Sequence, residues 1–129
     1  MASARELGYF VKSTQGSLRA WGAGYWTSAS LGTPIVHDRV FAITNSSLAW
    51  GRGPYVGFVE VDFREDLSLD VEQMKDGSWS IALIPARPDL AKTGRYPSLF
   101  NFTEVFGGDL RDSHAVVNFL LSKFPRHSA

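Results

Sequence analysis

The sequence predicts an α+β domain, and three features of the 129-residue chain lead to this class. Segments of alternating or β-branched apolar residues recur along the chain, as is typical of strands. An apolar stripe at helical spacing stands near the C-terminus. Strand and helix patterns do not alternate regularly, as they would in a parallel doubly wound sheet. We therefore expect one compact domain over residues 1–129, with 1–6 and 126–129 as flexible tails.

The expected elements follow from these patterns. Strands are predicted at 8–14, 40–44, 55–63, 67–71, 78–84 and 99–106, so that about six mostly antiparallel strands form one or two small sheets. Two or three short helices are expected, namely 15–21, a turn over 48–50 that Asn45 or Ser46 caps, and a C-terminal amphipathic helix that starts at Asp112 or Ser113. Residues 25–34 are rich in Ser, Thr and Gly and are predicted to form a loop, and Asp76-Gly77 is predicted to form a turn.

Composition narrows the classes of partner. Thirteen basic residues balance thirteen acidic ones, which gives no reason to expect nucleic acid or an anionic membrane as partner. There is no cysteine, so disulfides, thiolate metal sites and cysteine nucleophiles are excluded. The N-terminal residues lack the apolar core of a signal peptide, and no apolar run approaches the ~20 residues that span a bilayer. A cytoplasmic protein is expected, or one exported without a cleavable signal.

The densest polar feature is the stretch Glu60–Asp76, in which seven acidic residues accompany only Arg64 and Lys75. Such a run is typical of a solvated face, and an acidic surface for a basic protein partner is the functional alternative. We expect no metal site, because apolar residues stand where a calcium loop needs oxygen ligands. Glu60 itself falls inside a predicted strand, either at a solvent-facing edge or in a pocket.

Glu104 stands out among the candidate site residues. The alternation of its predicted strand places it on one face with Phe100, Phe102 and Phe106. A carboxylate in a row of phenylalanines needs a cation or a ligand. An ion pair with Arg95 or Arg111 and a functional role are equally good explanations.

Two further places carry residues suited to ligand binding. Arg52 stands between two glycines on a turn, where its guanidinium can grip a phosphate, although the P-loop lysine and spacing are missing. Tyr25 and Trp26 fall in the predicted loop, and exposed aromatic residues often stack on a ring or anchor a partner.

The segments VFAITNSSLAWG and YVGFVEVDF, with GYFVKST before them and FNFTEVF after them, together resemble ADP-ribosyltransferase-like domains. This superfamily includes small bacterial toxins and tRNA 2′-phosphotransferases. The resemblance implies NAD as substrate, bound between two small sheets, with cleavage of the nicotinamide–ribose bond or transfer of ADP-ribose. It assigns catalysis to Glu104. The implied NAD-binding residues are Thr44, Ser46, Ser47, Arg52, Tyr25 and Trp26.

The sequence also departs from that family. Its early strand normally supplies Arg or His, whereas this chain has Lys12, Ser13 and Thr14, and Phe102 stands where an acidic or amide residue is usual. The rival hypothesis is therefore a non-enzymatic module that binds another protein through its acidic surface, as an immunity or inhibitor-like protein does.

Overall fold

The structure is a computed structural model that describes residues 17–30, 33–51, 58–86 and 100–127. Within these ranges the chain forms one seven-stranded antiparallel sheet and one helix. The elements are β1 (Leu18–Ser30), β2 (Thr33–Thr44), β3 (Ser47–Gly51), β4 (Phe58–Asp62), β5 (Leu67–Gln73), β6 (Trp79–Pro85), β7 (Phe100–Gly108) and α3 (Ser113–Lys123). Their order across the sheet is β4-β3-β2-β1-β7-β6-β5.

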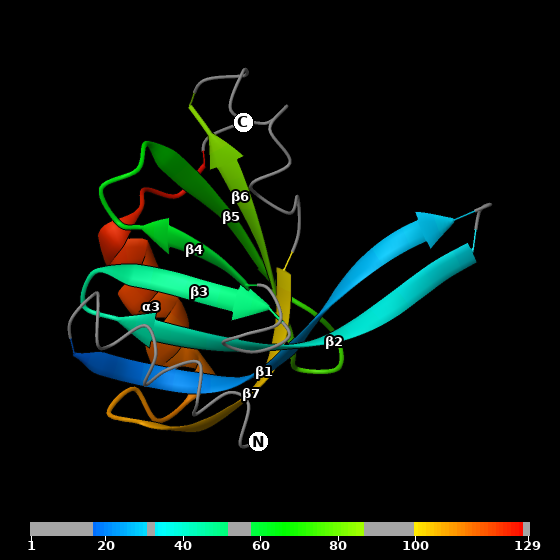
Figure 1. The fold of residues 1–129 in the computed structure, drawn as a ribbon, viewed down its shortest axis with the longest axis horizontal. Coiled ribbons are helices and arrows are strands. Elements are labelled where there is room, and N and C mark those ends of the chain that lie inside the picture. Colours follow the sequence, from blue (N-terminus) through cyan, green and yellow to red (C-terminus); the bar gives the residue numbers. More distant parts are fainter. Residues whose placement is uncertain (1–16, 31–32, 52–57, 87–99, 128–129) are drawn as a thin grey trace.

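The sheet curls into a half-barrel, and its connectivity explains why. The strands β4 and β5 lie at opposite edges of the sheet, yet only residues 63–66 join them. So short a connection forces the two edges towards each other (Figure 1). The segment after α3 then covers part of β5: the Leu69 N–H donates to the Pro125 carbonyl at 2.9 Å, and the His127 N–H donates to the Leu69 carbonyl at 2.7 Å.

The helix α3 lies across the concave side of this sheet (Figure 1). Asp112 caps its N-terminus, because the Asp112 carboxylate accepts a hydrogen bond from the Ala115 N–H at 2.9 Å. The core that the helix and the sheet share contains buried side chains from every strand and from α3: Ala20, Phe41, Ile43, Leu48, Trp50, Val61, Leu67, Leu69, Ile81, Leu83, Phe102, Val116, Val117, Leu120 and Phe124.

Several predicted elements are confirmed. The strand predictions at 40–44 and 67–71 coincide with parts of β2 and β5, and the prediction at 78–84 corresponds to β6, which begins one residue later. The predicted strand 99–106 corresponds to β7, apart from residue 99, which lies outside the described residues. The predicted strand 55–63 corresponds to β4, apart from the portion outside the described residues. The Asp76-Gly77 turn is present, with Gly77 at a φ of 89° that favours glycine. The predicted strand 8–14 lies outside the described residues.

The predicted α+β class is wrong: the described chain is mostly β, with a single helix. Three local predictions failed together. Residues 18–21, placed in a helix, belong to β1; residues 48–50, placed in a capped helical turn, form β3. The supposed loop 25–34 is part of β1 and β2, apart from residues 31–32. In each case pairing with a neighbouring strand outweighed a weak local preference.

The outer half of the β1–β2 hairpin leaves the sheet. The strand β7 pairs with β1 only as far as Tyr25, and β3 pairs with β2 only from Val40 onward. Beyond these points the two strands continue as pairs from Trp26↔His37 to Ser30↔Thr33. We call this part, 26–30 with 33–37, the projecting ribbon. It extends about 17 Å at the usual rise per residue, away from the body (Figure 1).

Candidate functional site

The first predicted binding segment, Thr44–Ser47, forms the tight corner between β2 and β3. The Thr44 hydroxyl accepts hydrogen bonds from the N–H groups of Ser46 and Ser47, both at 3.0 Å, and lies 3.2 Å from the Ser47 hydroxyl. Thr44 and Ser47 are fully buried. Their polar atoms therefore satisfy the turn itself.

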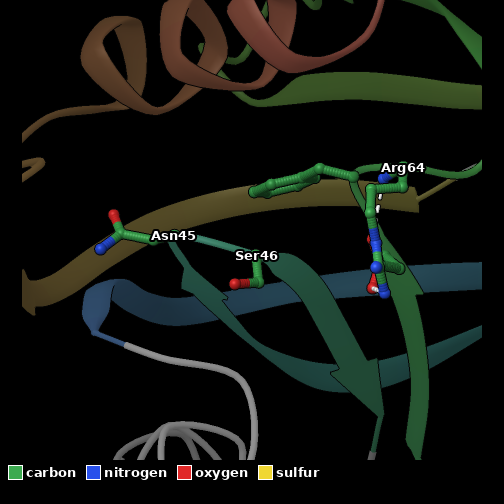
Figure 2. A pocket seen from close by; sticks show the side chains of 5 residues that line it. Asn45, Ser46 and Arg64 are labelled. Atoms are coloured by element: carbon green, nitrogen blue, oxygen red, sulfur yellow. Dashed lines mark hydrogen bonds and ion pairs between the residues drawn. The ribbon is translucent and has the colours of Figure 1, made fainter.

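A hollow of about 410 Å³ lies beside this corner. The residues that line it include Asn45 and Ser46 on the corner and Asp62, Phe63 and Arg64 where β4 ends (Figure 2). The Ser46 carbonyl accepts from the Phe63 N–H at 2.9 Å, which holds the two sides together. Among the described side chains of the predicted NAD-binding residues, that of Ser46 lines this hollow.

The charges at this hollow pair with each other. The Arg64 guanidinium donates to both Asp62 carboxylate oxygens, at 3.0 and 2.9 Å, and the Arg64 N–H donates to the same carboxylate at 2.8 Å. These hydrogen bonds hold the pKa of Asp62 below its usual value and raise the pKa of Arg64. The Asp62 carboxylate thus occupies the Nε–Nη2 edge of the Arg64 guanidinium.

Arg19 fastens the other end of the corner. Its Nε donates to both Asp109 oxygens at 3.0 Å, and its Nη1 donates to Asn45 Oδ1 at 3.0 Å. Its guanidinium carbon lies 4.8 Å from the centre of the Phe119 ring on α3. Arg19 thus connects β1, the end of β7, the corner and the helix.

The Arg19–Asp109 pair gives a pH prediction. The hydrogen bond from Arg19 lowers the pKa of Asp109. A carboxyl group whose pKa is lower in the folded chain stabilises the fold above its unfolded pKa, and this contribution is lost as the pH falls through the folded pKa. Asp109→Asn removes this carboxyl group, so we expect the variant to lose less stability than the parent chain as the pH falls. The difference should be no more than about 1 kcal/mol, because the pair is solvent-exposed.

Urea unfolding at pH 7 and at pH 3 measures this difference. The Asp109→Asn variant should be less stable than the parent chain at pH 7 and should come closer to it at pH 3. An equal gap at both pH values would show that the ion pair makes no contribution.

Glu104, the predicted catalytic residue, lies on β7 opposite Ala23 and is exposed. The prediction that it shares a face with Phe102 is wrong. Between Ala23 and Gly24 the register with β7 shifts from Glu104 to Phe102, which leaves Thr103 as an extra residue in a β-bulge. Phe102 is consequently buried while Glu104 faces solvent. No described residue forms an ion pair with Glu104, so the predicted pairing with Arg111 is not found there; Arg95 lies outside the described residues.

The predicted site residues do not gather at one place in the described chain. Thr44 pairs with Leu18 at one end of β1, whereas Tyr25 lies seven residues further along the strand, a distance of about 23 Å at the rise of a β-strand. Arg52 lies outside the described residues. The backbone of Trp26 is described, in the first pair of the projecting ribbon.

Tyr25 instead belongs to a row of polar residues that crosses four strands. Glu72 on β5 pairs with Ser80 on β6, Ser80 with Asn101 on β7, and Asn101 with Tyr25 on β1. Asn101 is buried, and its amide nitrogen donates to the Tyr25 hydroxyl at 3.2 Å. The row ends where the projecting ribbon begins.

A second hollow, of about 440 Å³, lies along this row, and its lining includes Tyr25 and the segment 72–76, which contains Glu72 from the other end of the row. Met74, which lines it, is 40% exposed and stands out among the described residues as an exposed large apolar side chain. The Asp76 carboxylate accepts from the hydroxyl and the N–H of Ser78, at 2.6 and 2.9 Å, and these bonds lower the pKa of Asp76. We call this hollow the ribbon notch.

The acidic stretch Glu60–Asp76 is divided by the structure. Asp62 and Asp76 are engaged in local bonds, and a Glu65 oxygen accepts from the Asp62 N–H at 3.0 Å. The remaining acids Asp66, Asp70 and Glu72 are exposed along β5 and the turn before it. Among the described residues, no three acidic, His or Cys side chains are grouped as metal ligands would be.

Glu60 is the unusual member of this stretch. It lies on β4 opposite Ala49, and its Oε2 is buried and accepts no hydrogen bond from any described residue. A buried acceptor left unsatisfied costs about 1–3 kcal/mol. Glu60→Met, which keeps the length of the side chain and removes the carboxylate, is expected to raise the free energy of unfolding by about 1 kcal/mol.

Urea unfolding of Glu60→Met measures this gain, with Glu72→Met as the matched control. Glu72 is exposed on β5, at the opposite edge of the sheet, so its replacement should leave stability within about 0.5 kcal/mol of the parent. A loss of stability in Glu60→Met alone would mean that the carboxylate makes a stabilising interaction.

The projecting ribbon is the feature that sequence reasoning missed. The Ser, Thr and Gly residues of the segment 25–34 predict a loop. A signal was nevertheless present, because Thr27, Thr33, Ile35 and Val36 are β-branched and no residue from 25 to 36 is Asp, Glu, Lys or Arg.

Comparisons with known proteins give no relative for this chain: no family model, no curated protein and no solved structure matches it. No helix among the described residues has both the length and the apolar character needed to cross a bilayer.

Proposed function

We propose that this chain is a protein-binding module whose binding element is the projecting ribbon. The observation that carries the proposal is the run of strand pairs from Trp26↔His37 to Ser30↔Thr33, beside which no other described strand pairs. Each outer edge of the ribbon therefore presents backbone N–H and C=O groups without a neighbouring strand in the described chain.

Such a ribbon gains from a partner for two reasons. A two-stranded hairpin has little stability of its own in water, and a further strand supplies both hydrogen bonds and burial. Native proteins usually protect exposed edges with charged side chains, whereas residues 25–36 contain no Asp, Glu, Lys or Arg. An extended segment of another chain that pairs with this edge would supply the missing hydrogen bonds and would cover an edge that has no charged side chains.

A shortened chain tests the proposal. Trp26 and His37 are directly opposite each other, so replacing residues 27–36 with Asn-Gly closes the hairpin by a two-residue turn. The body should stay folded, because β1 and β2 keep their pairing with β7 and β3. We expect the shortened chain to lose the protein contacts that the full chain makes in chemical cross-linking in its own cells. Retention of all these contacts by a folded shortened chain would refute the proposal.

The exposed acidic residues of β5 and of the turn before it give an independent variant for the same assay. If a basic protein binds there, replacing Asp66, Asp70 and Glu72 with lysine removes the cross-linked partner while the ribbon remains intact. Loss in the shortened chain together with retention in the triple variant would assign binding to the ribbon alone.

NAD binding, which the resemblance implies, stays a prediction with its own test. A ligand at a hundredfold excess over its Kd raises the free energy of unfolding by about 2.7 kcal/mol. Thermal unfolding with and without NAD measures this, and Glu104→Ala tests the assigned catalytic residue. An unchanged midpoint, together with an unchanged cellular effect of Glu104→Ala, would rule out the NAD prediction.

A further inference from the structure

We infer that the partner strand at the projecting ribbon comes from a second copy of this chain, and that the two β1 edges pair antiparallel about a twofold axis at Ser28. This inference rests on the proposed function and names its partner. Four features of the described chain support it: the chemistry of the two edges, the register left open on β1, the charge of the ribbon and the ribbon notch.

The two edges of the ribbon differ. Ser30 and Thr33 are separated by two residues, and a pair that closes so short a loop is hydrogen-bonded. Pairs alternate along an antiparallel ladder, so Ala29 and Pro34 form the next, non-hydrogen-bonded pair and direct their backbone groups outward. Pro34 has no N–H, so the β2 edge lacks a hydrogen-bond donor there and is less able to pair with a further strand. The β1 edge carries no proline, and beyond Tyr25 no described strand other than β2 pairs with β1.

The same alternation fixes the register of the β1 edge. Thr27 and Ala29 direct their N–H and C=O groups away from β2, while Trp26, Ser28 and Ser30 direct theirs towards it. Tyr25, the next outward residue, already lies opposite Asn101 of β7. A twofold axis at Ser28 places Thr27 of each copy opposite Ala29 of the other. This register uses both open outward residues of each copy and leaves the pairing with β7 undisturbed.

Charge favours a second copy over a different partner. Pairing about a twofold axis places equivalent or nearby residues opposite each other, so a charged strand would face its own charges. The uncharged run 25–36 avoids this repulsion, and it offers no charge to steer a different protein. The whole chain has a formal net charge of zero, so two copies do not repel each other at neutral pH.

The ribbon notch provides space for the approaching copy. In this register Ser30 of the second copy lies opposite Trp26, so the end of the second ribbon reaches the level of Tyr25. Tyr25 and the β5–β6 turn line the notch on the β1 side of the ribbon, because β7, β6 and β5 follow β1 in the sheet. The exposed Met74 lies in this notch, where burial against the second copy is favourable.

Two proline variants on one strand pair test which edge associates. Thr27 and Val36 are opposite each other, and both have outward N–H groups, one on each edge. Sedimentation equilibrium of the full chain should show a reversible dimer. We expect Thr27→Pro to be monomeric and Val36→Pro, its matched control, to dimerise as the parent does. Loss of the dimer in Val36→Pro alone would refute pairing through β1.

Cysteine variants test the register without relying on proline, since the chain has no cysteine of its own. Across the axis the two Ser28 residues would form a non-hydrogen-bonded pair with Cα atoms about 4.5 Å apart, within the range of a disulfide. The two Ser30 residues would lie about 14 Å apart, which is too far. We expect Ser28→Cys to yield a disulfide-linked dimer on mild oxidation and Ser30→Cys to remain uncoupled.

The results that would refute pairing with a second copy differ from those that would refute protein binding by the ribbon. A monomeric parent chain in which Ser28→Cys does not cross-link would refute the second copy, while ribbon-dependent contacts in cells would still support binding of a different protein. A dimer that persists in both Thr27→Pro and the shortened chain would place the contact outside the ribbon and refute the inference. Cross-linking of Ser30→Cys but not Ser28→Cys would refute the register.

Discussion

The Phe102→Ala variant is expected to lose about 3–5 kcal/mol of unfolding free energy, which is the usual cost of removing a buried phenylalanine side chain. Phe102 is 1% exposed and lies on β7, between β1 and β6 near the middle of the sheet. Its ring centre lies 5.6 Å from that of Phe41 on β2. Phe102 belongs to the buried core that the sheet shares with α3, so removal of its ring leaves a cavity among other buried side chains.

Urea unfolding followed by tryptophan fluorescence measures the loss. Phe102→Leu keeps most of the volume and is expected to cost much less, about 1 kcal/mol. Thr103→Ala, at the exposed bulge residue next to it, serves as the matched control and should change stability by less than about 0.5 kcal/mol. A loss in Phe102→Ala no larger than that in Thr103→Ala would contradict the burial of this ring in the core.

The Gly22→Ala variant is expected to lose about 3 kcal/mol or more, for a steric reason. A Cβ atom at Gly22 would collide with the backbone carbonyl of Glu104 and would lie 2.7 and 2.9 Å from two atoms of the Phe41 ring. The carbonyl belongs to β7, and the hydrogen bonds between β1 and β7 fix the separation of the two strands. Relief of the collision therefore requires the two strands to separate.

Gly77→Ala distinguishes this steric effect from the loss of glycine's conformational freedom. Gly77 has a φ of 89°, but a Cβ atom there would meet nothing within 4 Å. Its replacement should cost only about 1–2 kcal/mol, the usual cost of a positive φ for an L-residue. If Gly22→Ala were no more destabilising than Gly77→Ala, the close approach of β1 and β7 at this point would be wrong.

The strands that sequence reasoning found are those whose own residues show the pattern. In β5, buried Leu67 and Leu69 alternate with less buried residues, and the Asp76-Gly77 turn fixes the hairpin to β6. The α3 helix was equally readable, because its cap at Asp112 and its apolar stripe are local signals. The strand β3 shows no such pattern: all its residues are buried, so no alternation distinguishes it from a helical turn.

The candidate site was less accessible to sequence reasoning. The bulge at Thr103 moves Glu104 from the face of the phenylalanines to solvent, and a one-residue shift of this kind leaves no mark in the pattern. Thr44 and Ser47 have the residue types of a binding segment, yet their hydroxyls are used within the corner. In both cases the neighbouring strand or turn decides what the side chain does.

The β5–β6 hairpin, the capped C-terminal helix and the absence of cysteine chemistry can be read from the amino-acid sequence, since each depends on residues that are near one another or on composition alone. Three features become visible only in the folded chain: β4 and β5 lie at opposite edges, the sheet curls over α3, and the β1–β2 hairpin extends beyond the described strands beside it. These features depend on which distant strands pair and where that pairing stops. A hydrophobic pattern shows which residues avoid water, but it does not name the strand that covers them.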